Sequence, residues 1–106
     1  MYELRFFFDA GSGICLWAKN SAARNRFGYP VDLGELPLSE NTRRWLQYLI
    51  GWFDTSLNWD SPGDVRPHWT EEETQRFKKA TQSGYEMLCN ELPISEYAVA
   101  NEAGAR

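Results

Sequence analysis

The feature that most constrains the fold is a wide apolar stripe between residues 39 and 57. Four large apolar residues follow one another at intervals of four: Trp45, Leu49, Phe53 and Leu57. This spacing places their side chains on one face of an α-helix, and Leu46, Tyr48, Ile50 and Trp52 widen that face. Ser39 is a suitable N-cap and Glu40 suits the first turn. The pattern predicts a central buried helix that runs from Ser39 to about Leu57.

Gly51 interrupts this stripe. Glycine in a helix interior costs roughly 1 kcal/mol relative to alanine. The sequence therefore predicts that another backbone or a large aromatic ring approaches the helix closely at Gly51.

The first eighteen residues have the pattern of a β-hairpin. Apolar residues alternate with other residues over 2–8, which predicts a strand. Residues 9–13 contain two glycines and an aspartate and predict a turn, and 14–18 predict the returning strand. A short helix is expected over 22–27, capped by Asn20 or Ser21 and ended by Gly28.

A second long helix is predicted after residue 69. Thr70 and Glu73 form the pattern of a capping box, in which the glutamate returns to the backbone amide of the cap residue. An apolar stripe follows, Pro93 ends the helix, and residues 97–99 predict a short strand. We expect an α+β fold, in which a small antiparallel sheet, made of the N-terminal hairpin and the C-terminal strand, packs against two long helices. Residues 1–100 are expected to form a single domain, with 101–106 as a flexible tail.

The charge balance limits the partners of the chain. Its 106 residues contain 11 Lys and Arg against 15 Asp and Glu, a net charge of −4. The densest basic stretch is interrupted by acidic residues: it contains Arg24, Arg26, Arg43 and Arg44 with Glu35 and Glu40. Direct binding of nucleic acid is therefore disfavoured, and a basic protein partner is favoured. No apolar run reaches 18 residues and no secretory signal is evident, which predicts a cytoplasmic protein outside the membrane.

Few side chains are available for catalysis or metal binding. His68 is the one histidine, and Ser12 in the glycine-containing turn has no evident base. The sequence therefore predicts no catalytic residue, no metal site and no cofactor. Cys15 and Cys89 are interpreted as two buried, reduced thiols, and a disulfide between them is the less favoured alternative.

The region from 54 to 72 is acidic and aromatic at once. Tryptophan is enriched at the energetic centres of protein interfaces, and carboxylates suit a partner rich in Arg and Lys. The sequence predicts partner binding by Asp54, Asn58, Trp59, Asp60, Asp64, Trp69, Glu71 and Glu72. Structural alternatives exist for each kind of residue. The indoles could pack on the core, Asp54 could make local hydrogen bonds, and the glutamates could match the charge of a helix N-terminus.

Several segments together resemble a group of small uncharacterised bacterial cytosolic proteins. They are Phe-Asp-x-Gly-Ser-Gly-x-Cys-Leu-Trp at 8–17, Leu-Pro-Leu-Ser at 36–39, Trp-Phe-Asp-Thr-Ser-Leu-Asn-Trp-Asp-x-Pro at 52–62 and Glu-Leu-Pro at 91–93. The resemblance covers most of residues 6–99 and implies no known activity. In size, acidity and aromatic content the chain also resembles the immunity proteins of contact-dependent growth inhibition systems. That resemblance implies a toxin domain, commonly a basic nuclease, as the partner.

Three hypotheses follow. The first is a non-enzymatic immunity protein that occludes the active site of a cognate toxin. The second is a small ligand-binding or hydrolytic domain with a pocket at the 58–69 loop, where Asp54, Asp60 and His68 would supply polar groups. The third is a homodimer formed through an exposed Phe7 or through an unpaired strand edge at 14–18.

Overall fold

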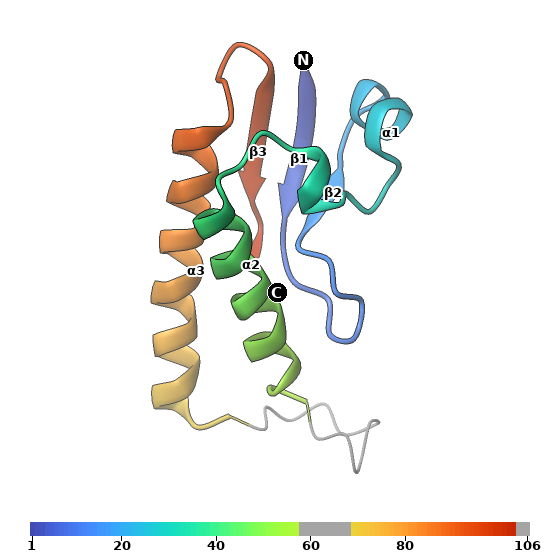
Figure 1. The fold of residues 1–106 in the computed structure, drawn as a ribbon. Coiled ribbons are helices and arrows are strands. Elements are labelled where there is room, and N and C mark those ends of the chain that lie inside the picture. Colours follow the sequence, from blue (N-terminus) through green and yellow to red (C-terminus); the bar gives the residue numbers. More distant parts are fainter. Residues whose placement is uncertain (58–68, 104–106) are drawn as a thin grey trace.

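A computed structural model describes residues 1–57 and 69–103 of the chain. The strands are β1 (Tyr2–Phe6), β2 (Leu16–Ala18) and β3 (Tyr97–Asn101), and the helices are α1 (Ser21–Phe27), α2 (Glu40–Asp54) and α3 (Glu71–Glu91), with a 3₁₀ turn over Leu33–Glu35. Figure 1 shows α2 and α3 side by side and running in opposite directions. The predicted α+β class with two long helices is confirmed.

The sheet has the order β2-β1-β3. Strands β1 and β2 pair antiparallel, with Arg5 opposite Trp17, which confirms the hairpin. Strand β3 instead pairs parallel to β1, with Tyr97 beside Tyr2, so the prediction of an all-antiparallel sheet is wrong for this strand. The reason is the length of α3, which carries the chain back to the end of the sheet where β1 begins (Figure 1).

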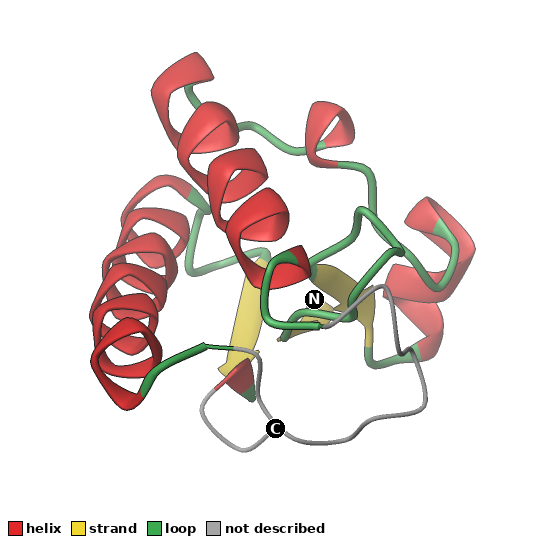
Figure 2. Cartoon of the chain, turned by 90° about the horizontal axis from the view of Figure 1, so that it is seen from below, coloured by secondary structure: helices red, strands yellow, loops and turns green. Residues whose placement is uncertain are grey.

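The core lies between the sheet and the two long helices. Leu4 and Phe6 on β1 are fully buried, as are Leu46 and Leu49 on α2 and Leu88 on α3. The view from below shows both long helices on the same side of the sheet (Figure 2). The period-two and helical patterns thus converge on one core, as expected from their apolar faces.

The two long helices pack tightly at Gly84 and not at Gly51. A Cβ atom on Gly84 would lie 2.9 Å from Cδ1 of Leu49. A Cβ atom on Gly51 would meet nothing within 4 Å, and Gly51 is exposed. The predicted close approach at Gly51 is therefore wrong, because the residue lies on the solvent side of α2.

The predicted helix caps are confirmed. Side chains of Asn20, Ser39 and Thr70 each accept a hydrogen bond from a backbone N–H in the first turn of α1, α2 and α3, respectively. Helix α2 ends at Asp54, a little before the predicted Leu57. It ends there because the hydroxyl and the backbone N–H of Thr55 both donate to the carbonyl of Trp52, which closes the last turn.

The C-terminal strand extends further than the sequence predicts. Asn101 pairs with Phe6, so the predicted domain boundary at residue 100 falls inside β3. Arg5 donates two hydrogen bonds to the carboxylate of Glu102, at 2.9 and 2.8 Å. These contacts join 101 and 102 to the sheet, and residues 104–106 of the predicted tail lie outside the described residues.

Neither contact predicted for a homodimer is exposed. Phe7 is buried and stacks on Trp17, with ring centroids 4.9 Å apart. The outer edge of β2 is covered by the following segment, because Ala18 donates to Tyr29 and Val31 donates to Leu16. Phe7 is therefore covered by Trp17, and the outer edge of β2 is covered by residues 29–31, so neither is open to a second copy of the chain. Both cysteines are free thiols, and Cys15 is buried as expected, but Cys89 is exposed on α3, so the expectation of two buried thiols is wrong for Cys89.

Candidate functional site

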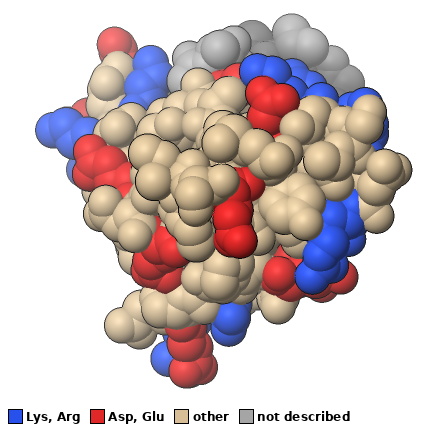
Figure 3. Space-filling model, turned by 90° about the horizontal axis from the view of Figure 1, so that it is seen from above, with Lys and Arg blue, Asp and Glu red and all other residues tan. Residues whose placement is uncertain are grey.

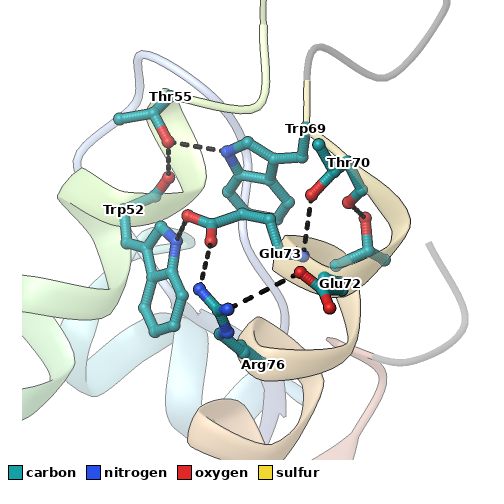
Figure 4. A network of polar contacts seen from close by, with 8 residues as sticks. Trp52, Thr55, Trp69, Thr70, Glu72, Glu73 and Arg76 are labelled. Atoms are coloured by element: carbon teal, nitrogen blue, oxygen red, sulfur yellow. Dashed lines mark hydrogen bonds and ion pairs between the residues drawn. The ribbon is translucent and has the colours of Figure 1, made fainter.

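The predicted interface residues that the structure describes gather where α2 ends and α3 begins. Figure 4 shows this region, with Trp52 and Thr55 from the end of α2 facing Trp69, Thr70 and Glu73. The antiparallel packing of the helices brings the two chain segments together. The local structure follows from the caps, since Thr55 closes α2 and Thr70 opens α3.

Trp69 packs against the core. Its ring centroid lies 4.9 Å from that of Phe77 and 6.4 Å from that of Phe53. Its indole N–H donates to the hydroxyl of Thr55 at 2.7 Å. The structure thus gives Trp69 the packing role that the sequence left as an alternative, and it satisfies the polar end of the indole.

Glu73 differs from its predicted role. The capping box predicts a return of its carboxylate to the cap amide, but Oε1 accepts a hydrogen bond from the indole N–H of Trp52 at 2.8 Å. The other half of the box is present, because Thr70 Oγ1 accepts from the Glu73 N–H at 3.2 Å. The half-buried indole of Trp52 requires an acceptor, and Glu73 is the neighbouring side chain that provides one.

Asp54 makes a contact within the domain. Its Oδ1 accepts a hydrogen bond from the backbone N–H of Gly11 at 2.9 Å. Gly11 belongs to the turn between β1 and β2 and has a φ of 82°, a value that favours glycine. Asp54 therefore connects the end of α2 to this turn through a contact between residues 43 positions apart, which differs from the local hydrogen bonding offered as an alternative.

Glu71 and Glu72 are exposed in the first turn of α3. Glu72 lies 3.7 Å from Arg76, an exposed pair that contributes little to stability. Glu71 and Glu72 lie at the positive end of the helix dipole, which favours carboxylates, and both carboxylates are accessible there. The other predicted partner-binding residues, Asn58, Trp59, Asp60 and Asp64, lie outside the described residues, as does most of the loop proposed as a ligand pocket, including His68.

A groove between the two helices opens beside this cluster. We call it the helix-pair groove, and it is lined by Gln47, Tyr48, Gly51, Trp52, Thr55, Glu73 and Arg76. Its volume is about 660 Å³. Tyr48 is 59% exposed at its edge. The sequence analysis does not assign Tyr48, Gly51, Glu73 or Arg76 to a site. The one signal in the sequence that points to this groove is Gly51, a residue that weakens the helix within an apolar stripe.

Other parts of the described surface offer less specific features. A smaller pocket of about 290 Å³ lies between α3 and β3 and is lined mainly by apolar residues such as Ile94 and Val99. Within 1–57 and 69–103, no group of three or more His, Cys, Asp or Glu side chains is arranged to hold a metal ion. None of the described helices is both long and apolar enough to cross a membrane.

The end of the molecule shown in Figure 3 carries charges of both signs. Acidic and basic side chains alternate there with uncharged surface. Such a mixture produces no extended field of one sign over that face.

The comparisons with known proteins give one assignment. No curated protein matches the chain. The family model described as Serratia CdiI immunity protein-like matches residues 3–101, from the second residue of β1 to the last residue of β3. Immunity proteins of this kind are non-enzymatic inhibitors of the toxins of contact-dependent growth inhibition systems. The chain belongs to the Serratia CdiI immunity protein-like family.

Proposed function

We propose that the protein neutralises its cognate toxin by binding the toxic domain and covering its active site. The observation that carries this proposal is the family match, which spans the whole folded unit from β1 to β3. A toxin-neutralising role follows from the family. The occlusion of an active site, and a basic nuclease as the toxin, are the finer parts of the proposal.

Charge supports a basic partner. The chain has a net charge of −4, and Glu71 and Glu72 are exposed at the start of α3. A nuclease holds phosphates with Lys and Arg, and carboxylates of an inhibitor can occupy the same positions. We propose that Glu71 and Glu72 form the acidic part of the interface together with Asp60 and Asp64, and that the neutral side chains of Asn58 and Trp59 belong to the same interface. Because the toxin acts after entry into the target cell, the proposal places this complex in the cytoplasm.

Trp69 and Asp54 have a supporting part in this proposal. Both already make contacts within the domain, Trp69 with Thr55 and Asp54 with Gly11. Their substitution is expected to alter the interface through the fold and not through lost contact with the toxin. Trp59 is then the tryptophan we propose as an anchor residue on the toxin.

The test is binding to the purified cognate toxin domain, with charge reversal at two of the proposed positions. Replacing both Asp60 and Asp64 by lysine should slow association by about tenfold or more and reduce its dependence on salt, because steering between opposite charges is lost. Stopped-flow association at low and high ionic strength measures both effects. The matched control reverses two exposed carboxylates elsewhere, Glu40 and Glu86.

Two results would contradict the proposal. The first is wild-type protein that does not bind the toxin domain, or that does not stop the toxin domain from cutting nucleic acid; this result excludes the proposed mechanism. The second is an association rate that falls equally in the double variant and in the control. The effect would then come from net charge alone, and Asp60 and Asp64 would not belong to the interface. Thermal melting of each variant establishes that the fold is retained.

A further inference from the structure

We infer that the helix-pair groove receives an arginine side chain of the toxin, with Tyr48 and Trp52 as the aromatic surface and Glu73 as the counter-charge. This inference rests on the proposed function and assigns a specific anchoring site for the same partner. The groove lies beside the exposed start of α3, so one partner surface can cover both (Figure 4).

The first argument is the open space at Gly51. Glycine weakens a helix, and Gly84 on α3 shows the usual compensation, since the close approach of Leu49 leaves no room for a side chain there. At Gly51 nothing within the described structure occupies that space. Gly51 lines the helix-pair groove between Tyr48 and Trp52, so a side chain at this position would take up space that glycine leaves open.

The second argument is the aromatic row along α2. Trp45, Tyr48 and Trp52 follow one another with ring centroids 5.6 and 5.8 Å apart. Tyr48 is among the few large apolar side chains that remain mostly exposed. Tyrosine and tryptophan rings are the preferred surfaces for a guanidinium group and are enriched at the energetic centres of interfaces.

The third argument is the position of the Glu73 carboxylate. One of its oxygens, Oε1, is fixed by the indole N–H of Trp52 at 2.8 Å. The other, Oε2, faces Nη1 of Arg76 at 3.7 Å, which is longer than the roughly 2.8 Å of a charge-assisted hydrogen bond. A guanidinium that enters the groove can therefore approach Oε2 more closely than Arg76 does.

These features together select a cationic and planar occupant. Aromatic faces and a fixed carboxylate match a guanidinium, which stacks and donates in the same plane. Glu72, 3.7 Å from Arg76, adds negative charge beside the groove, against the single positive charge of Arg76 among its lining residues. An acidic side chain would be repelled by the Glu73 carboxylate, and a purely apolar one would cover it without donating a hydrogen bond.

Adding a side chain at Gly51 is the direct test. Gly51→Gln places a neutral side chain with good helix propensity at an exposed position, so the melting temperature should be equal or higher. Affinity for the purified toxin domain, measured by calorimetry, should fall by about 30-fold or more, the size expected for loss of an anchor residue. The control is Asn41→Gln, an exposed position on the same helix about 15 Å away along its axis. It should bind as the wild type does.

The counter-charge is tested by Glu73→Gln. Glutamine keeps an oxygen that accepts the Trp52 hydrogen bond and removes the negative charge, so the packing is retained. Affinity should fall by about tenfold. The control Glu86→Gln removes an exposed carboxylate from the same helix about 20 Å further along and should have little effect.

The identity of the occupant is tested on the toxin. Each arginine of the toxin domain is replaced by alanine in turn. One of these toxin variants should bind the wild-type immunity protein more weakly than the unmodified toxin does, but should bind the Glu73→Gln variant as well as the unmodified toxin does. Coupling to a toxin carboxylate instead of an arginine would overturn the assignment of the occupant. Unchanged affinity of Gly51→Gln, with a wild type that binds, overturns this inference alone; a wild type that does not bind overturns the proposed function as well.

Discussion

At the scale of single residues, the two glycines of the long helices have opposite surroundings. Gly51 faces open space, whereas a Cβ atom on Gly84 would lie 2.9 Å from Leu49 and 3.2 Å from Leu46. Both leucines are fully buried and have little freedom to move. The same residue type therefore reflects packing at one position and an open surface at the other.

Alanine at these two positions should change stability in different ways. Gly51→Ala should raise the free energy of unfolding by about 1 kcal/mol, because the helix gains propensity without a clash. Gly84→Ala should be less stable than Gly51→Ala by about 1–3 kcal/mol, the usual cost of overpacking a core. Urea unfolding of both variants measures the difference. Equal stability would show that α3 moves freely away from α2.

At the scale of elements, the end of α3 caps the start of α2. The backbone N–H and the hydroxyl of Ser39 donate to the carboxylate of Glu91, and the buried hydroxyl of Thr42 donates to it as well. Ser39 also caps α2 through its own side chain. A residue 52 positions away in the sequence therefore completes the N-terminus of α2.

This contact makes stability depend on pH. The backbone hydrogen bond from Ser39, followed by the hydroxyl of Thr42, holds the pKa of Glu91 below its ordinary value of 4.5. A lowered folded-state pKa means that the stabilisation is present above 4.5 and is lost as the pH falls through the lowered pKa. Between pH 7 and 3, wild-type protein should therefore lose more stability than Glu91→Gln, as measured by thermal melting.

The control is Glu86→Gln, which replaces an exposed carboxylate on the same helix. It should retain the pH dependence of the wild type. Removal of the side chain by Glu91→Ala should cost about 1–2 kcal/mol at neutral pH, the range of a lost helix cap. A pH profile of Glu91→Gln that matches the wild type would exclude Glu91 as the titrating group.

At the scale of the whole molecule, the two thiols report on different parts of the structure. Cys15 is fully buried in the core, and burial raises the pKa of its thiol to about 12. Cys89 is exposed on α3. Because a thiolate is the reactive form, Cys15 is protected in the folded protein by both burial and protonation.

A thiol-specific reagent at neutral pH should therefore label Cys89 within minutes and Cys15 only through unfolding. Mass spectrometry should show one label per folded chain and two after denaturation. Cys89→Ser should abolish the fast reaction and leave the slow one. Rapid labelling of Cys15 would indicate that the sheet and α2 separate locally without global unfolding.

Local patterns along the chain are enough to predict most of the elements and the residues at the centre of each buried face. The alternation at Leu4 and Phe6, the stripe through Leu46 and Leu49, and the caps at Ser39 and Thr70 follow from local spacing and local hydrogen bonds. These are properties of neighbouring residues, so a single sequence predicts them. The resemblance to immunity proteins was also visible in the sequence, and the family match confirms it.

Which distant residues meet depends on how the elements pack together. The parallel pairing of β3 depends on where α3 returns the chain, and the partner of Glu73 depends on Trp52 arriving from another helix. The role of Gly51 follows from which side of α2 faces solvent. Such contacts form between segments far apart in the chain, and their identity is fixed by packing and not by local preference. The helix-pair groove depends on such packing as well, because its lining residues come from both α2 and α3.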